Sequence, residues 1–160
     1  MNGSQTKKLR ARRGFSLLEL LTVVAILGIL LAMGIPQIMN MSSSYKLTGA
    51  VDSVQWAIAS TRYQAIMKGY YYELTISNSN TQYQVYSKIP PATSYTTVGN
   101  ATPITSTAVT ISPATTTLQF SPSGSISVVA GNSNPNTITV TYSGQSHTLT
   151  VSNYGQVTIQ

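Results

Sequence analysis

The stretch FSLLELLTVVAILGILLAMGI, residues 15–35, decides the fold, because it holds a single charged side chain, Glu19, in 21 residues. An apolar helix of this length, rising about 1.5 Å per residue, can cross the roughly 30 Å hydrocarbon core of a bilayer. Basic side chains crowd its N-terminal side: Lys7, Lys8, Arg10, Arg12 and Arg13. This asymmetry predicts a single-pass protein with a cytoplasmic N-terminus and with everything after Pro36 across the membrane.

Glu19 is the feature that a simple anchor does not explain. An acid in a membrane helix costs about 2.5–3.5 kcal/mol at the bilayer centre and less near an end. One interpretation is that Glu19 lies close enough to the interface to stay hydrated. The other is that Glu19 needs a cation, which it meets only in an assembly.

The residues RGFSLLE, 13–19, followed by the unbroken apolar run, resemble the class III signal of type IV pilins and type II secretion pseudopilins. The resemblance implies cleavage between Gly14 and Phe15 by a prepilin peptidase, followed by N-methylation of Phe15. It also implies that Glu19 pairs with the Phe15 amine of a neighbouring subunit. An ordinary secretory signal ending near Gly34 is the alternative, but its apolar region is usually only 7–15 residues long and gives Glu19 no role.

Composition narrows the function classes for this chain of 160 residues, which suits one domain plus an anchor. Charged residues are 8% of the chain, against roughly 25% in ordinary soluble domains. Five of the nine basic residues precede Gly14, so side chains after the leader sum to only +1 and nucleic acid is not indicated as a partner. The chain has no cysteine, which excludes disulfides and thiolate metal sites. Within the family that the N-terminal residues resemble, many major pilins have a C-terminal disulfide, so the resemblance implies a pseudopilin or minor pilin.

We expect an α+β, pilin-like fold with a long N-terminal helix packed on an antiparallel β-sheet head. Its parts would be a leader that is removed, a transmembrane and assembly helix, an amphipathic helix half and a β-rich globular head: residues 1–14, 15–36, 37–69 and 70–160. Pro36 lacks an N–H and its ring crowds the preceding turn, so with Gly34 it predicts a kink or local melting of the helix.

After Pro36 the helix becomes one-sided. A stripe at spacings of three and four residues predicts its buried face: Leu47, Val51, Val54, Ile58, Thr61 and Ala65. Trp56 is expected to pack in the core. Lys46, Asp52, Gln55 and Arg62 fall mainly on the other side, and Gly69 suits the position just past the helix end.

From Tyr70 the period changes to two, with Tyr72, Leu74 and Ile76 on one strand face and a returning strand near Tyr83–Tyr86. Residues 88–107 contain Pro90, Pro91, Gly99 and Pro103 and are expected to form a long variable loop. Short strands separated by turn residues follow: 108–111, 117–120, 125–129, 137–142, 147–151 and 156–159.

This second half resembles the GspH/FimT group of minor pseudopilins and minor pilins. The resemblance rests on RYQAIMKG at 62–69 leading into a strand, LQFSPSG at 118–124 and NYGQV at 153–157. It implies a non-enzymatic structural subunit of a type IV pilus or type II secretion pseudopilus. The implied partners are prepilin peptidase, other pilin or pseudopilin subunits and an inner-membrane assembly platform. The subunit would start in the bacterial inner membrane with a periplasmic head and then enter the pilus or pseudopilus.

Catalytic, metal and cofactor sites are not indicated. The single histidine, His147, lies in a Ser/Thr-rich strand, and the exported part has only Asp52 and Glu73 as acids, too few for a triad or a calcium site. Two other functions stay open. One is a DNA-binding FimT-like minor pilin for natural transformation, although clustered cations are lacking, and the other is an unrelated single-pass membrane-anchored binding protein.

Overall fold

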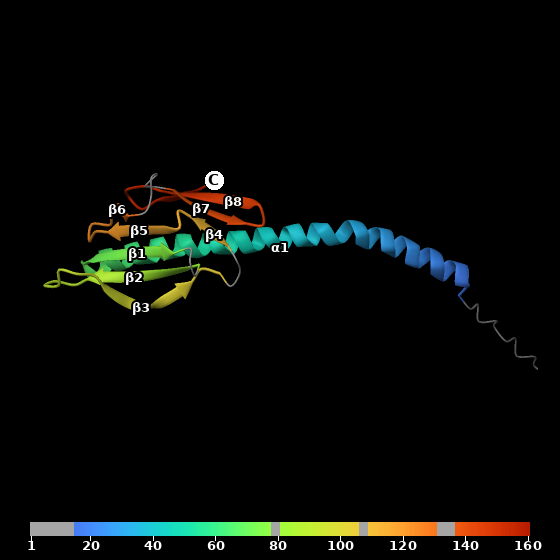
Figure 1. Cartoon of the computed structure of the whole chain (residues 1–160), viewed down its shortest axis with the longest axis horizontal. Helices are drawn as coiled ribbons and strands as arrows, with labels where there is room; N and C mark the ends of the chain where they lie inside the picture. The colour runs from blue at the N-terminus through green and yellow to red at the C-terminus, as the bar shows by residue number, and fades with distance from the viewer. Residues whose placement is uncertain (1–14, 78–80, 106–108, 131–136) are drawn as a thin grey trace, which may run out of the picture. The chain divides into compact units, whose positions relative to one another are not determined.

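The computed structural model describes residues 15–77, 81–105, 109–130 and 137–160, so the leader lies outside the described residues (Figure 1). The chain divides into two compact units, residues 1–39 and 40–160. The first unit holds the beginning of the helix α1, Leu17–Lys68, and the second holds the rest of α1 together with all the described strands.

Helix α1 begins just after Ser16, whose carbonyl accepts the first helical hydrogen bond from Leu20 N at 3.1 Å. The α-helix then runs through Gly34 and Pro36 without a break. The helix is continuous at this point, and the kink expected at Gly34 and Pro36 stays a prediction.

The end of α1 follows the sequence prediction. Gly69 adopts φ +71°, a left-handed conformation that glycine accepts at little cost. Its N–H donates to the carbonyl of Ala65 at 3.0 Å, the hydrogen bond of a left-handed helix cap. Lys68 lies in the last turn, where a cation is favoured by the helix dipole.

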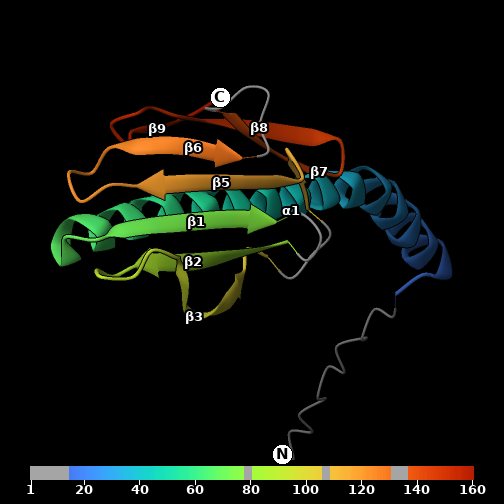
Figure 2. The same cartoon turned by 60° about the vertical axis from the view of Figure 1, so that its left-hand side comes forward.

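The strands form two antiparallel sheets in the second unit. The five-stranded sheet has the order β3-β2-β1-β5-β6, and the four-stranded sheet has the order β4-β7-β8-β9 (Figure 2). Their bounds are β1 Tyr71–Ser77, β2 Gln82–Lys88, β3 Thr96–Pro103, β4 Thr110–Ser112, β5 Thr115–Phe120, β6 Ile126–Ala130, β7 Thr137–Tyr142, β8 Gln145–Val151 and β9 Val157–Ile159.

The predicted helix stripe is the centre of the core: all six side chains from Leu47 to Ala65 are at most 2% exposed. The five apolar members of the stripe share one cluster with Leu74, Ile76 and Phe120 of the five-stranded sheet and with Ile138, Val140 and Leu149 of the other. Burial of a single Leu or Ile side chain contributes about 1.5–3 kcal/mol. The α+β class with a helix packed on antiparallel strands is thus confirmed.

Three expectations for the head are corrected. The strands divide between two sheets rather than forming one. The segment 88–107 is not a loop throughout, because β3 lies within it and pairs with β2. Trp56 is 64% exposed and does not belong to the core, since it lies two residues from Val54 and therefore on the opposite side of the helix.

Candidate functional site

The start of α1 presents its apolar side chains outward within the first unit. Phe15 is 75% exposed and Leu17 is 82% exposed, and the large hydrophobic side chains from Phe15 to Ile35 are all exposed. An 18-residue window in this helix has a mean hydropathy of 2.5, and none of it is buried. Soluble monomers rarely expose an apolar surface of this extent, and the helix is long and apolar enough to cross a membrane.

Glu19 lies in the first turn of α1 and is exposed. Its backbone carbonyl accepts a hydrogen bond from Thr22 Oγ1 at 2.9 Å. Within the described ranges no lysine, arginine or histidine forms a salt bridge with its carboxylate. A first-turn acid is favoured by the helix dipole, but only by about 0.3–1 kcal/mol at an exposed site. The dipole therefore makes only a small contribution to the stability of the Glu19 carboxylate.

The other predicted site residues are distributed along the same segment. Gly14 lies outside the described residues, whereas Phe15 lies two residues before the first residue of the helix. Apart from the neighbouring backbone of its own helix, no atom of the described residues lies within 4 Å of the position that a Cβ of Gly34 would occupy. Phe15 and Glu19 are four residues apart in the sequence, and their roles in processing and assembly stay predictions.

Arg62 forms a contact that the sequence did not reveal. Its Nε–H donates to the carbonyl of Gly124 at 2.9 Å, and the side chain is half-buried. Gly155 lies against the same guanidinium, because a Cβ built there would approach Arg62 Nε to 2.6 Å. We call Arg62, Gly124 and Gly155 the arginine clasp. It joins the end of α1 to the turn before β6 and to the turn before β9.

A backbone hydrogen bond reinforces the arginine clasp between the same two turns. Ile126 N donates to the carbonyl of Asn153 at 2.8 Å, so the two sheets are connected beside Arg62. The sequence signal for this arrangement was present only as the turn motifs SPSG and NYG. Each predicts a turn, but neither says that both turns meet one arginine.

The remaining titratable groups do not form a catalytic constellation within the described part of the chain. His147 is half-buried on β8 and faces Val140 in the register of β7. No group of three or more His, Asp or Glu side chains converges among the described residues. Burial raises the pKa of the Glu73 carboxyl on β1. The amines of Lys46 and Lys88 lie 5.7 and 6.0 Å from the ring centres of Tyr142 and Tyr95.

Comparison with known proteins agrees with this description. Residues 50–155 match the family described as type II transport protein GspH, and residues 9–35 match the prokaryotic N-terminal methylation motif. Two fimbrial proteins of Pseudomonas aeruginosa are each 36% identical over 77 residues, which is 48% of this chain and 49% of the relative. The chain thus matches about half the length of these relatives.

A solved structure has a similar fold. The minor pseudopilin EpsH from the type 2 secretion system of Vibrio cholerae superposes with a TM-score of 0.53 at 12% identity. The superposition covers 72% of this chain and 96% of EpsH. At this level of identity the likeness concerns the fold alone.

Proposed function

Because this chain belongs to the GspH family of type II transport proteins, we propose that it is a structural, non-enzymatic minor subunit of a type IV pilus or a type II secretion pseudopilus. In this proposal a prepilin peptidase cleaves between Gly14 and Phe15, and the new amine of Phe15 is methylated. Residues 15–36 then hold the subunit in the bacterial inner membrane, with its head in the periplasm. An assembly platform transfers it into a filament of related subunits.

One observation carries this proposal: an exposed apolar helix with a single acid in its first turn. Exposure of this surface suits a segment that lies first in lipid and later among the helices of neighbouring subunits. Both surroundings are apolar, so the transfer does not expose the side chains to water. The N-terminal methylation motif covers the same residues and supports processing at this place.

Glu19 gives the transfer its selectivity in this proposal. A carboxylate without a partner is costly in a dry helix bundle, whereas a carboxylate paired with a cation is far less so. Cleavage after Gly14 would create that cation, the amine of Phe15, on each incoming subunit. The ion pair between Glu19 and the Phe15 amine of a neighbour would then set the register of incorporation.

Processing is tested by the intact mass of the protein from cells that contain a prepilin peptidase. We expect a chain that begins at Phe15 and carries one methyl group. Gly14→Val should leave the full-length precursor, while Gly3→Val, a matched change elsewhere in the leader, should be processed normally. A wild-type protein that retains Met1 in such cells would contradict the proposal.

A further inference from the structure

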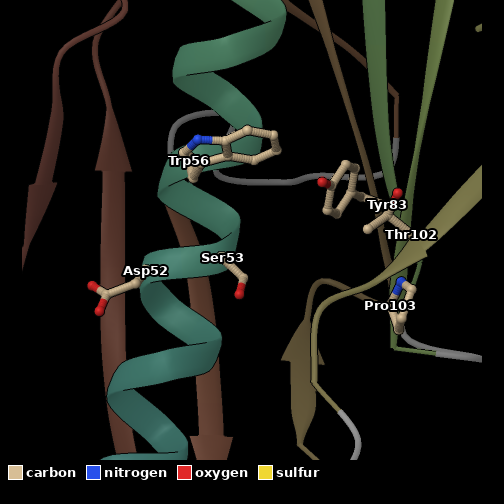
Figure 3. A pocket seen from close by; sticks show the side chains of 6 residues that line it. All are labelled: Asp52, Ser53, Trp56, Tyr83, Thr102 and Pro103. Carbon is tan, nitrogen blue, oxygen red and sulfur yellow. The ribbon is translucent and has the colours of Figure 1, made fainter.

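The five-stranded sheet packs on α1 with its inner face and presents an outer face on the other side. Tyr83 of β2 marks the inner face, because it points toward Trp56 of α1 across a cavity of about 310 Å³ (Figure 3). Successive side chains of a strand alternate between the two faces, which places Lys88 of β2 on the outer face. Glu73 of β1 and Gln119 of β5 are half-buried between buried neighbours and lie on the outer face as well.

The register of the sheet brings these outer side chains next to one another. Glu73 of β1 lies opposite Tyr86 of β2 and, on its other side, opposite Gln119 of β5. Lys88 lies opposite Tyr71, the next residue of β1 on the same face. An acid thus lies on the middle strand, with an aromatic ring on one side and an amide on the other.

Tyr95, which directly precedes β3, reaches across this outer face. Its hydroxyl accepts a hydrogen bond from Nε2 of Gln119, and its ring centre lies 6.0 Å from the amine of Lys88. Gln119 belongs to β5 and Lys88 to β2, and β1 lies between these strands. The bonded side chains of Tyr95 and Gln119 therefore span β1 beside Glu73. We call Tyr95, Gln119 and Lys88 the tyrosine latch.

Glu73 is the group of this cluster that changes charge between acid and neutral pH. Burial raises the pKa of its carboxyl. Burial also raises the pKa of Tyr95, and the hydrogen bond from Gln119 lowers it. The charges of Glu73 and Tyr71 raise the pKa of Tyr95 further, so the acid and the latch interact. Tyrosine and lysine side chains ordinarily titrate at about pH 10, and Ser127, which β6 contributes beside Gln119, carries no charge.

From this arrangement we propose that the tyrosine latch is a pH-operated switch, which is closed over Glu73 while the carboxyl is protonated and is released when it ionises. Covering a carboxylate removes hydration that a neutral carboxyl needs far less. Opening the latch restores water to the carboxylate, so ionisation favours the open form by linkage. A rise in pH would free the segment 89–95 and uncover the outer face of β1 near Tyr71.

The linkage fixes the pH range in which the latch responds. The closed latch holds the pKa of Glu73 above its ordinary value, and the open latch lets it return toward that value. The open fraction should therefore increase as the pH rises from the ordinary pKa to the raised one, and it should stay constant above that range. In Glu73→Gln the carboxyl is replaced by a neutral amide, so the latch should stay closed at every pH.

The composition of the chain makes both sides of this linkage measurable. Glu19 and Glu73 are the only glutamates, so isotopic labelling of glutamate carboxyl carbons gives two NMR signals for the full chain in detergent micelles, which Glu73→Gln assigns. The chain has no cysteine, so a spin label on Ser94→Cys reports the mobility of the segment 89–95 alone. We expect the mobile fraction to increase by roughly twofold or more along the titration of the Glu73 signal.

Tyr95→Ala and Tyr142→Ala separate the latch from a general effect of removing a tyrosine. Tyr142 is the matched control, because the amine of Lys46 lies 5.7 Å from its ring centre on the other sheet. Tyr95→Ala should lower the pKa of Glu73 toward its ordinary value. Gln119→Ala, which keeps the tyrosine ring, should have a smaller effect of the same sign, and Tyr142→Ala should have none.

Three results would overturn the proposal. The first is a label mobility that is independent of pH or that decreases as Glu73 ionises. The second is a pH-dependent mobility that persists unchanged in Glu73→Gln. The third is a Glu73 titration that Tyr95→Ala leaves unchanged, or that Tyr142→Ala shifts by as much.

Discussion

Removal of Arg62 tests the arginine clasp most sharply when it is combined with a change at Gly155. Arg62→Ala deletes the hydrogen bond to the carbonyl of Gly124, and a bond from a charged group contributes about 1.5–3 kcal/mol. Gly155→Ala has two costs. The residue has φ +80°, which penalises alanine by about 1–2 kcal/mol, and the new Cβ would overlap the side chain of Arg62, adding about 1–3 kcal/mol.

In the double variant the overlap disappears, because an alanine side chain at position 62 is too short to reach residue 155. Only the backbone cost of about 1–2 kcal/mol should then remain for Gly155→Ala. The two changes should therefore be coupled by about 1–3 kcal/mol. Gly144→Ala is the matched control, since Gly144 also has φ +80° but no atom lies within 4 Å of its Cβ position.

Urea unfolding of the head, followed by far-ultraviolet circular dichroism on the detergent-solubilised chain, measures the free energy of unfolding of each single and double variant. We expect Gly144→Ala to be additive with Arg62→Ala and Gly155→Ala to be strongly non-additive. Equal costs for the two glycine changes, each additive with Arg62→Ala, would refute the contact between Arg62 and the turn before β9.

Two further predictions concern the helix end and the sheet. Gly69→Ala should destabilise the head by about 1–2 kcal/mol, because φ is +71° there. Gly49→Ala in the helix interior should stabilise the head by about 0.5–1 kcal/mol. Shifts of the urea midpoint in the same direction for both variants would contradict this. Since burial raises the pKa of Glu73 in the folded state, ionisation opposes folding at neutral pH. Near pH 7 the melting temperature of Glu73→Gln should therefore be higher than that of wild type. This difference in melting temperature should disappear as the pH falls through the raised pKa. A difference that stays constant or grows toward acid pH would show that burial of Glu73 has no such effect.

The parts of the fold that were predictable are those with a local period. The helix stripe from Leu47 to Ala65 and the alternation from Tyr72 to Ile76 appear in the sequence because each buries one face. The strand β3 has no such alternation, since all eight of its residues are exposed at the edge of the sheet. Its Gly99 and Pro103, together with Pro90 and Pro91 before it, indicated a loop instead.

The other differences between expectation and structure have a second cause. The chemical type of a side chain does not by itself say which side of the helix it lies on or what covers it. The apolar ring of Trp56 favours the core, but its position in the helix places it on the side opposite the buried stripe from Leu47 to Ala65. Arg62 is expected on the polar side of the helix, and its side chain is half-buried near the surface. The turns that contain Gly124 and Gly155, both more than 60 residues further along the chain, lie against it. Contacts of this kind depend on tertiary packing, which no local pattern encodes.

Glu19 is the central residue of the account, and its own alternatives can be separated by substitution. A hydrated acid or a favourable charge in the first turn would matter little for incorporation. An acid that pairs with the Phe15 amine of a neighbour would be required. Glu19→Gln keeps the shape and the hydrogen-bonding oxygen but removes the charge, and Glu73→Gln is the matched change in the head.

The most direct measurement is the fraction of processed subunit found in sheared filaments relative to the membrane. For Glu19→Gln we expect normal cleavage after Gly14 and a loss of incorporation of at least tenfold. This loss corresponds to about 1.4 kcal/mol or more, because the variant leaves the Phe15 amine of the neighbouring subunit without a counter-charge. For Glu73→Gln we expect wild-type incorporation. If Glu19→Gln entered filaments as well as wild type does, the pairing of Glu19 with a neighbouring amine would be wrong.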